Sequence, residues 1–274
     1  MNALPSLGLG IGWRPALGRT IDARQDLSFV ELVAENLDPR HPLPCAVRRL
    51  THSGVKVVLH GLSLSLGGAE PVDVRRLDAL ARLAEATGAC LVSEHAAFVR
   101  AGGKEAGHLL PLPRNAPALE ALVENVRRAQ AVLPVPLAIE NIASLIEWPG
   151  AEMDEPEFLS ELVTATGCGL LVDVANLYAN ALNGGFSGYE WLDAIPQGRI
   201  AYVHLAGGTR RGGLYHDTHA HPLPSGSLDL LAHLGPRARG FMLERDANFP
   251  PADELNAELD AIVCAVSAAT RSAA

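Results

Sequence analysis

The chain has 274 residues, of which 48% are hydrophobic and 5% aromatic, and its formal net charge is −9. This composition excludes a disordered chain and provides for one large α/β core, and the absence of any Lys/Arg cluster disfavours nucleic-acid binding. No uncharged apolar run reaches the roughly 18 residues that span a membrane, and the N-terminus lacks the features of a signal peptide. Four cysteines without a C-x-x-C pair indicate reduced thiols. We therefore expect a cytoplasmic protein that binds neither nucleic acid nor membrane.

Eight short apolar runs recur along the chain, and polar residues stand at or near the end of most of them. The runs cover residues 8–13, 29–36, 56–61, 91–99, 136–142, 170–176, 200–207 and 241–246. Runs this short, most of them rich in Val, Ile, Leu or Phe, are typical of strands buried on both faces of a parallel sheet.

Helical patterns lie between these runs. Apolar residues recur at helical spacing over 71–88, 115–133, 155–166 and 252–270. Eight strands alternating with helices predict an α/β fold, a (β/α)8 TIM barrel formed by one domain over residues 1–274. An open doubly wound sheet is the competing architecture, but the chain has no G-x-G-x-x-G turn or P-loop to mark a nucleotide crevice.

Polar side chains stand where most of the predicted strands end. They are Glu35, Asn36, His60, Glu94, His95, Glu140, Asn141, Asp173, Asn176, His204, Glu244, Arg245 and Asp246. In a TIM barrel all carboxyl ends of the strands meet at one mouth, where active sites lie. Burying unpaired carboxylates costs several kcal/mol. Because Arg245 is the only cation among these strand ends, metal ions are the predicted counter-charge.

A second cluster follows the seventh strand, in the sequence GLYHDTHAH, which contains His216, Asp217, His219 and His221. We expect a loop here, in which Asp217 and His219, two residues apart in an extended segment, face the same way and chelate one ion. Imidazoles and carboxylates without thiolates suit Fe, Mn, Zn or Co. More than six ligands predict two or three ions with bridging carboxylates such as Glu140, and spacing does not separate iron from zinc.

Other catalytic signatures fit less well. The chain has no G-x-S-x-G elbow, and we expect Ser93 to point away from His95. A glycosidase that works with two carboxylates would not need so many histidines.

Blocks along nearly the whole chain resemble the multinuclear nonheme iron-dependent oxidative enzymes. This family includes the iron oxygenase of methanobactin biosynthesis and an enzyme that acts on a peptide-borne cysteine in 3-thiaglutamate biosynthesis. The matching blocks, in order, are GLGIGWRP, ELVAEN, LHGLSLSLGG, LVSEHAAF, LPLPRN, IENIAS, EPEFLSELV, TGCGLLVDVANLY, VHLAG, DTHAHP and LERDANFP.

The resemblance implies a xylose-isomerase-like TIM barrel and a set of roles for the strand-end residues. His60 and His95 would bind one iron, and Glu140 would bridge to a second. The second iron would be bound by Asp173, His204 and Glu244, and a third, more loosely held ion by Asp217 and His219. Of these, Glu140, His60 and His95 are the predicted catalytic residues, and Asn141 and Asn176 match polar positions near the cluster.

The activity that the resemblance implies is an O2-dependent modification of a cysteine in a ribosomally synthesised precursor peptide. The cofactor would be two or three iron ions with a mixed-valent Fe(II)/Fe(III) pair, and a partner protein would deliver the peptide. Two departures concern substrate choice and the third ion: Ala175 stands where many relatives have Asn in DVNN, and Gly208 where many have His in LAGH.

Two other interpretations of the same residues stay open. A non-redox di- or trinuclear enzyme with Zn or Mn, either a sugar isomerase or a phosphodiesterase of the xylose-isomerase-like type, would use the same rim of His, Asp and Glu. A metal-binding scaffold without catalysis would hold its ions with no exchangeable coordination position.

Overall fold

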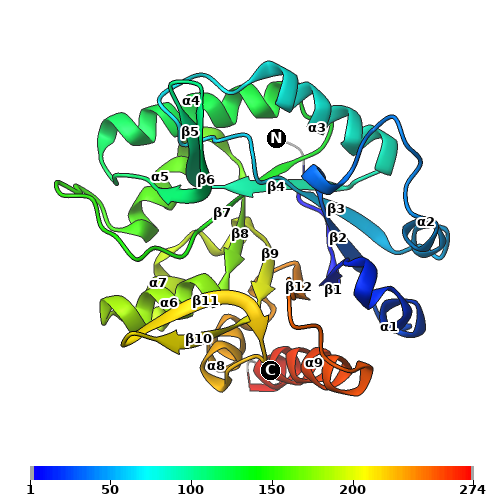
Figure 1. Ribbon diagram of the computed structural model, residues 1–274. Helices are drawn as coiled ribbons and strands as arrows, with labels where there is room; N and C mark the ends of the chain where they lie inside the picture. Colours follow the sequence, from blue (N-terminus) through cyan, green and yellow to red (C-terminus); the bar gives the residue numbers. More distant parts are fainter. Residues whose placement is uncertain (1–2, 273–274) are drawn as a thin grey trace.

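Eight parallel strands close into a barrel in the computed structural model, which describes residues 3–272 (Figure 1). Around the barrel the order is β1-β12-β9-β8-β7-β4-β3-β2, and every neighbouring pair is parallel. The barrel strands are β1 (Gly8–Gly12), β2 (Phe29–Val33), β3 (Lys56–His60), β4 (Leu91–His95), β7 (Leu137–Glu140), β8 (Gly169–Asp173), β9 (Ile200–Leu205) and β12 (Gly240–Leu243). Each lies within or overlaps one of the eight predicted runs, so the TIM-barrel prediction is confirmed.

Helices surround the barrel and bury the outward-facing strand residues. They are α1 (Gly18–Ala23), α2 (Cys45–His52), α3 (Val74–Thr87), α4 (Ala116–Val132), α5 (Glu155–Thr166), α6 (Val174–Gly184), α7 (Gly188–Ala194), α8 (Ser225–Leu234) and α9 (Ala252–Ser272). Asp73, Asn115 and Asp154 cap the N-termini of α3, α4 and α5 with their side chains. Left-handed glycines end α3 and α5, at Gly88 and Gly167. Single 3-10 turns occupy Pro15–Leu17, Ala34–Asn36, Gln197–Arg199 and Gly235–Arg237.

The barrel interior is filled by an apolar plug below its mouth. Inward-facing side chains from the strands form it: Phe29, Val58, Leu91, Ala138, Leu171, Tyr202 and Met242. Room for the Phe29 ring comes from Gly10 on β1, where a Cβ would lie 2.3 Å from a ring carbon. Because side chains alternate along a strand, the residues two positions further on also face inward, at the level of the mouth. His60, Glu140, Asp173, His204 and Glu244 therefore face inward directly above the plug.

Two hairpins are inserted after barrel strands. The first joins β5 (Ala97–Ala101) to β6 (Lys104–Pro111), and the second joins β10 (Gly207–Arg211) to β11 (Leu214–His221). The predicted run over 91–99 therefore contains two strands, and the expected loop after the seventh barrel strand is wrong, because residues 214–221 form β11. The described helices include none with the length and apolar character of a membrane span.

Candidate metal centre

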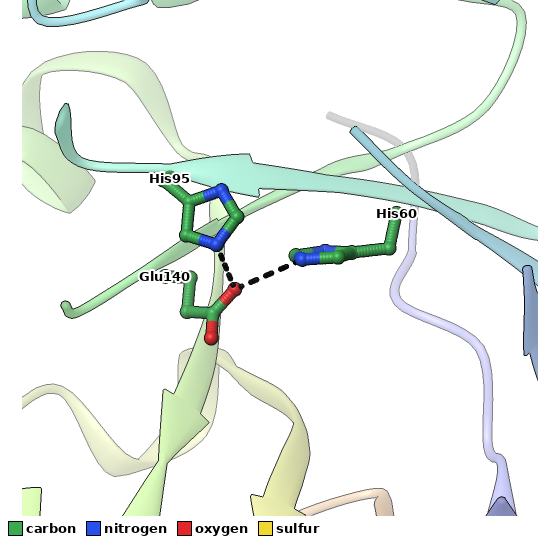
Figure 2. Close-up of side chains that lie close together, drawn as sticks. All are labelled: His60, His95 and Glu140. Carbon is green, nitrogen blue, oxygen red and sulfur yellow. Dashed lines mark ion pairs between the residues drawn. The ribbon is translucent and has the colours of Figure 1, made fainter. Parts of the chain in front are cut away.

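Two histidines and one glutamate from neighbouring strands form the first ligand group. His60 ends β3, His95 ends β4 and Glu140 ends β7, and all three side chains are buried. The same carboxylate oxygen of Glu140, Oε2, lies 3.1 Å from Nε2 of His95 and 3.5 Å from Nε2 of His60 (Figure 2). Two ligands that share an ion at about 2.1 Å lie roughly 3 to 4 Å apart. The three side chains therefore have the spacing of ligands to one metal ion.

The second ligand group lies on the other side of Glu140. Its other oxygen, Oε1, lies 3.4 Å from Nδ1 of His204 on β9. That nitrogen is also 2.9 Å from Glu244 Oε2 and 3.9 Å from Asp173 Oδ2. The carboxylate of Glu140 thus faces the first group with one oxygen and the second group with the other, as the predicted bridging ligand would.

The third ligand group combines a barrel strand with the second hairpin. Nε2 of His219 lies 2.7 Å from Asp217 Oδ2 and 3.3 Å from Asp173 Oδ2. His219 adopts a positive φ of 50°, which costs a non-glycine residue on the order of 1 kcal/mol or more. Its carbonyl oxygen accepts a hydrogen bond from the Asp246 backbone at 2.8 Å. The hairpin is therefore held in a strained conformation that brings His219 to the mouth.

These groups adjoin and share members. Ligand atoms within 4.8 Å of one another define the triads His60/His95/Glu140, Glu140/Asp173/His204, Asp173/Asp217/His219, Glu31/His204/Glu244 and His219/Glu244/Asp246. Several buried atoms here make no hydrogen bond of good geometry among the described residues, although most of them lie within ion-pair distance of one another: Glu140 Oε2, Asp173 Oδ2, His204 Nδ1, Asp217 Oδ1 and His219 Nε2. Unsatisfied buried polar atoms are costly, and metal ions would satisfy them. The donor set of imidazole nitrogens and carboxylate oxygens thus fits a multinuclear metal site.

The electrostatics of the cluster follow from its burial and its carboxylates. Burial lowers the pKa of His95, but the charges of Glu140 and Glu94 outweigh it and raise that pKa to about 9. Burial lowers the pKa of His60 to about 3, and the charges of His95 and His204 act in the same direction against that of Glu31. Burial raises the pKa of Glu140 to about 7 against the opposing charge of His95. Protons thus balance the carboxylates when no metal is bound, and metal ions would compete with them.

Asparagine side chains hold Asp173 in place. The Asn141 side chain accepts a hydrogen bond from the Asp173 backbone N–H at 2.9 Å and donates one to the Asp173 carbonyl at 3.0 Å. Asp173 Oδ1 caps α6 by accepting the Asn176 backbone N–H at 2.8 Å, and the Asn176 side chain donates to the Asn141 carbonyl. One carboxylate oxygen of Asp173 therefore fixes a helix, while the other is free to face the second and third groups.

Sequence reasoning missed two residues of this site. Glu31 on β2 is fully buried and accepts from Nε2 of His204 at 2.8 Å, and it lies two residues beyond Phe29 of the plug. Arg14 pairs with Glu244 at 3.2 Å and with Asp246. Strand alternation from Phe29 would have indicated Glu31. Nothing in the local pattern indicates Arg14, which follows β1.

Several predicted strand-end residues do not join the cluster. Glu35 and Asn36 are exposed on a 3-10 turn, and Glu35 accepts the Leu62 backbone N–H at 2.8 Å. Arg245 turns toward α9 and pairs with Glu258 at 2.5 Å. Arg245 was the only cation among the predicted strand ends, but it does not lie at the mouth. Arg14 lies there instead, beside Glu244 and Asp246.

The remaining polar residues have local partners. Glu94 accepts the backbone N–H groups of Leu64 and His95 and contacts Nδ1 of His95 at 3.3 Å. His216 contacts the Arg211 carbonyl, and His221 contacts the Thr218 hydroxyl. Glu94 thus orients a ligand, whereas the two outer hairpin histidines lie outside every described triad.

The positions of Ser93 and Gly208 bear on two expectations from the sequence, the orientation of the serine and the missing side chain in the second hairpin. Ser93 and His95 are two residues apart and share a face, and Ser93 Oγ lies 2.8 Å from Nδ1 of His60. The expectation that it points away from His95 is therefore wrong. At Gly208 a Cβ would lie 2.2 Å from the His216 carbonyl oxygen, so this hairpin leaves no room for the histidine side chain of an LAGH motif. Ala175 is buried in α6.

The fold and this site define a TIM-barrel protein with a cluster of His, Asp and Glu side chains at its mouth that could hold metal ions. The chain belongs to the family described as RiPP precursor modification enzyme MbnB/TglH/ChrH, whose model matches residues 8–267. RiPPs are ribosomally synthesised and post-translationally modified peptides, so the family resemblance seen in the sequence is confirmed.

Sequence relatives are consistent with this assignment. A UPF0276 protein of Streptomyces avermitilis is 54% identical over 271 residues, which are 96% of this chain and 55% of that protein, so the chain spans about half its length. One from Caulobacter vibrioides is 37% identical and matched over 95% of this chain and 94% of its own.

Among solved structures, a xylose isomerase domain protein from Planctomyces limnophilus has a TM-score of 0.61 at 13% identity, over 97% of this chain and 100% of that one. A D-psicose 3-epimerase from Clostridium cellulolyticum has a TM-score of 0.57 at 13% identity, over 97% of each chain. These likenesses show the fold alone, and they confirm the xylose-isomerase-like barrel.

Proposed function

We propose that the protein is a multinuclear nonheme iron enzyme that uses O2 to modify a cysteine residue of a ribosomally synthesised precursor peptide. The family supports an enzyme of RiPP modification. The proposed cofactor is two or three iron ions, with a mixed-valent Fe(II)/Fe(III) pair.

One observation carries this proposal. Glu140 directs its two oxygens to two different sets of histidine nitrogens, and Asp173 is shared between the second and third groups. A mononuclear site would not need a carboxylate that faces two ligand groups, or five buried ligand atoms that make no hydrogen bond of good geometry. Iron bound in these groups would supply the redox chemistry with O2.

The barrel holds the proposed ligands rigidly and keeps water away from the side of the site that faces the barrel interior. Six of the proposed ligands stand at or just beyond the ends of barrel strands, and the apolar plug beneath them excludes water from below. Glu94 contacts Nδ1 of His95 and Ser93 contacts Nδ1 of His60, so that Nε2 of each ring faces Glu140. Such partners orient metal ligands and increase their basicity.

A groove beside the mouth supports a peptide substrate. It has a volume of about 740 Å³ and begins at Ala96 and Ile142, next in sequence to His95 and Asn141. Exposed apolar side chains line its outer part, among them Leu145 and Phe186. Its charged lining is mainly acidic: Glu147, Asp154 and Glu190 against Arg114. We propose that an extended peptide segment with apolar and basic side chains lies here.

Two further elements of the proposal concern the cell. A partner protein would deliver the precursor peptide, and the acidic balance of −9 is compatible with a basic partner. The four cysteines Cys45, Cys90, Cys168 and Cys264 are free, which supports action in the reducing cytoplasm.

The experiment begins with anaerobic purification, followed by metal analysis and Mössbauer spectroscopy. We expect iron at two or more equivalents, and O2 consumption when reductant and a cysteine-containing precursor peptide are both present. His60→Gln should abolish turnover, whereas His52→Gln on the exposed face of α2 should leave it unchanged. A peptide with serine in place of cysteine serves as the substrate control.

The outcome that contradicts the proposal is zinc or manganese as the only bound metal, without O2 consumption. Hydrolytic or isomerase turnover by that form would favour the non-redox alternative. A full complement of ions with no exchangeable position would favour a scaffold.

A further inference from the structure

Two histidines on opposite sides of Glu140 each direct one ring nitrogen to the mouth and the other below it. His60 places Nε2 3.5 Å from Glu140 and Nδ1 2.8 Å from the Ser93 hydroxyl. His204 places Nδ1 toward Glu140 and Glu244, and Nε2 2.8 Å from Glu31 Oε2. The two rings are therefore oriented in opposite senses, with different nitrogens available for a metal ion.

The contacts below the mouth join these histidines through one buried chain of hydrogen bonds. The Ser93 hydroxyl lies 2.7 Å from the Tyr202 hydroxyl, and Tyr202 donates to Glu31 Oε2 at 2.5 Å. Ser93, Tyr202 and Glu31 are all completely buried. Glu31 Oε2 is therefore the last acceptor of the hydrogen-bond chain that starts at His60, and it is also the acceptor for Nε2 of His204.

The direction of each hydrogen bond follows from the carboxylate, which only accepts. The Tyr202 hydroxyl donates its hydrogen bond to Glu31, so the Tyr202 oxygen accepts a hydrogen bond from the Ser93 hydroxyl. Ser93 in turn accepts from Nδ1–H of His60, which leaves Nε2 of that ring with a free lone pair. A longer contact of 3.4 Å from Ser93 to the Leu59 carbonyl is the competing acceptor for the serine proton.

We propose that Glu31 is a positioning residue that fixes the metal-binding tautomers of two histidines at once. It acts directly on His204, where Nε2 keeps the proton and Nδ1 is free, and through Tyr202 and Ser93 on His60. These histidines belong to different ligand groups, so one carboxylate sets the ligand form of both. This inference rests on the proposed metal centre. Acceptors of this kind determine which imidazole nitrogen binds metal.

The chain offers a variant that separates the two branches. Tyr202→Phe removes the link to His60 and keeps the contact between Glu31 and His204, whereas Glu31→Gln weakens both. Ser93→Ala is a second interruption of the His60 branch. Tyr178→Phe is the matched control, because Tyr178 packs between α6 and α8, away from this chain of hydrogen bonds.

The experiment measures nitrogen-15 NMR spectra of the histidine rings in the metal-free, full-length protein, and then during titration with Zn²⁺. Wild type should show His60 protonated at Nδ1 alone throughout, and His204 protonated at Nε2 alone once Zn²⁺ displaces the proton that Glu140 and Glu244 hold on its Nδ1. Tyr202→Phe and Ser93→Ala should alter the His60 tautomer alone and weaken Zn²⁺ binding at His60 by about tenfold or more. Glu31→Gln should alter both, and Tyr178→Phe neither.

Each contrary outcome has a defined meaning. The inference is overturned if Tyr202→Phe leaves both histidines unchanged, or if it weakens both positions equally. Wild-type tautomers opposite to those expected would also overturn it. Should Glu31→Gln fail to fold, the other two variants still decide. The expected His60 tautomer in a wild type that binds neither Zn²⁺ nor Fe²⁺ would instead overturn the proposed function.

Discussion

One carboxylate oxygen of Glu140 lies 3.1 Å from Nε2 of His95, while the other oxygen of Glu140 faces away from His95 toward the second ligand group. Replacing these two residues should therefore have unequal effects. We expect Glu140→Ala to lower metal content at two positions and His95→Ala at only one. Elemental analysis and Zn²⁺ titration check this difference. Glu147→Ala, on an 85% exposed side chain, is the control, and equal losses in the Glu140 and His95 variants would contradict the bridging geometry.

The third ligand group should release its ion first. Asp217 and His219 arrive on a hairpin whose strands pair only with each other, whereas the other groups stand on the closed barrel. We expect a chelator to remove one class of ion faster than the rest, and Asp217→Asn to eliminate that class selectively. Asp229→Asn on the exposed side of α8 is the control. Simultaneous release of all ions would show that the hairpin and barrel positions are equivalent.

Arg245 should matter for stability and not for metal binding. Its guanidinium is buried and pairs with Glu258 on α9, away from the ligand groups. Removing one partner of a buried ion pair leaves an uncompensated charge, so we expect Arg245→Met to reduce the free energy of unfolding by about 2 to 4 kcal/mol. Urea unfolding measures this loss, and Zn²⁺ affinity should stay unchanged.

The exposed pair of Arg128 and Glu124 provides the comparison for this prediction. Arg128→Met should cost less than about 1 kcal/mol, because solvent screens such pairs. A change in metal affinity in Arg245→Met would place its charge at the mouth after all.

Glu155 should make stability depend on pH. Burial raises its pKa to about 7, although it accepts a hydrogen bond from the Trp191 indole at 3.0 Å. The folded protein thus keeps this proton between about pH 4.5 and 7 while the unfolded chain loses it. The contribution of Glu155 is therefore present below pH 4.5 and is lost as pH rises to about 7, by on the order of 1 to 3 kcal/mol.

The Glu155→Gln variant isolates this effect. The free energy of unfolding of this variant should rise relative to that of wild type as pH increases from 5 to 8, because the amide does not ionise. Thermal and urea unfolding at both pH values measure the difference. A gap between variant and wild type that stays constant with pH would contradict the raised pKa.

The sequence allowed the barrel and the eight proposed ligands to be predicted because both depend on local pattern. Short aliphatic runs indicate strands, and closure of the barrel brings residues as distant as His60 and Glu244 to one mouth. Six of the proposed ligands could be identified because each is a polar residue at or near the end of a short apolar run. Asp217 and His219 could be identified because they lie in a segment that is rich in histidine.

The missed residues depend on features that strand ends do not display. Glu31 lies inside β2, and the more conspicuous Glu35 lies on an exposed turn. Arg14 reaches Glu244 across 230 residues of sequence, and no local pattern encodes that contact. The hairpins were not expected because β5 continues almost directly from β4, and β11 is rich in polar residues.

The hairpin that carries Asp217 and His219 is a separate two-stranded sheet, so it can be altered without changing the pairing of the barrel strands. The barrel ligands are embedded in the frame on which folding depends, so their replacement would endanger the whole chain. The hairpin is an appendage, and glycines at positions 207 and 208 fit it tightly to its own backbone. Exchange of this single insert would therefore alter the third ligand group alone, while the six proposed ligands at the barrel strands and the frame that holds them would stay in place.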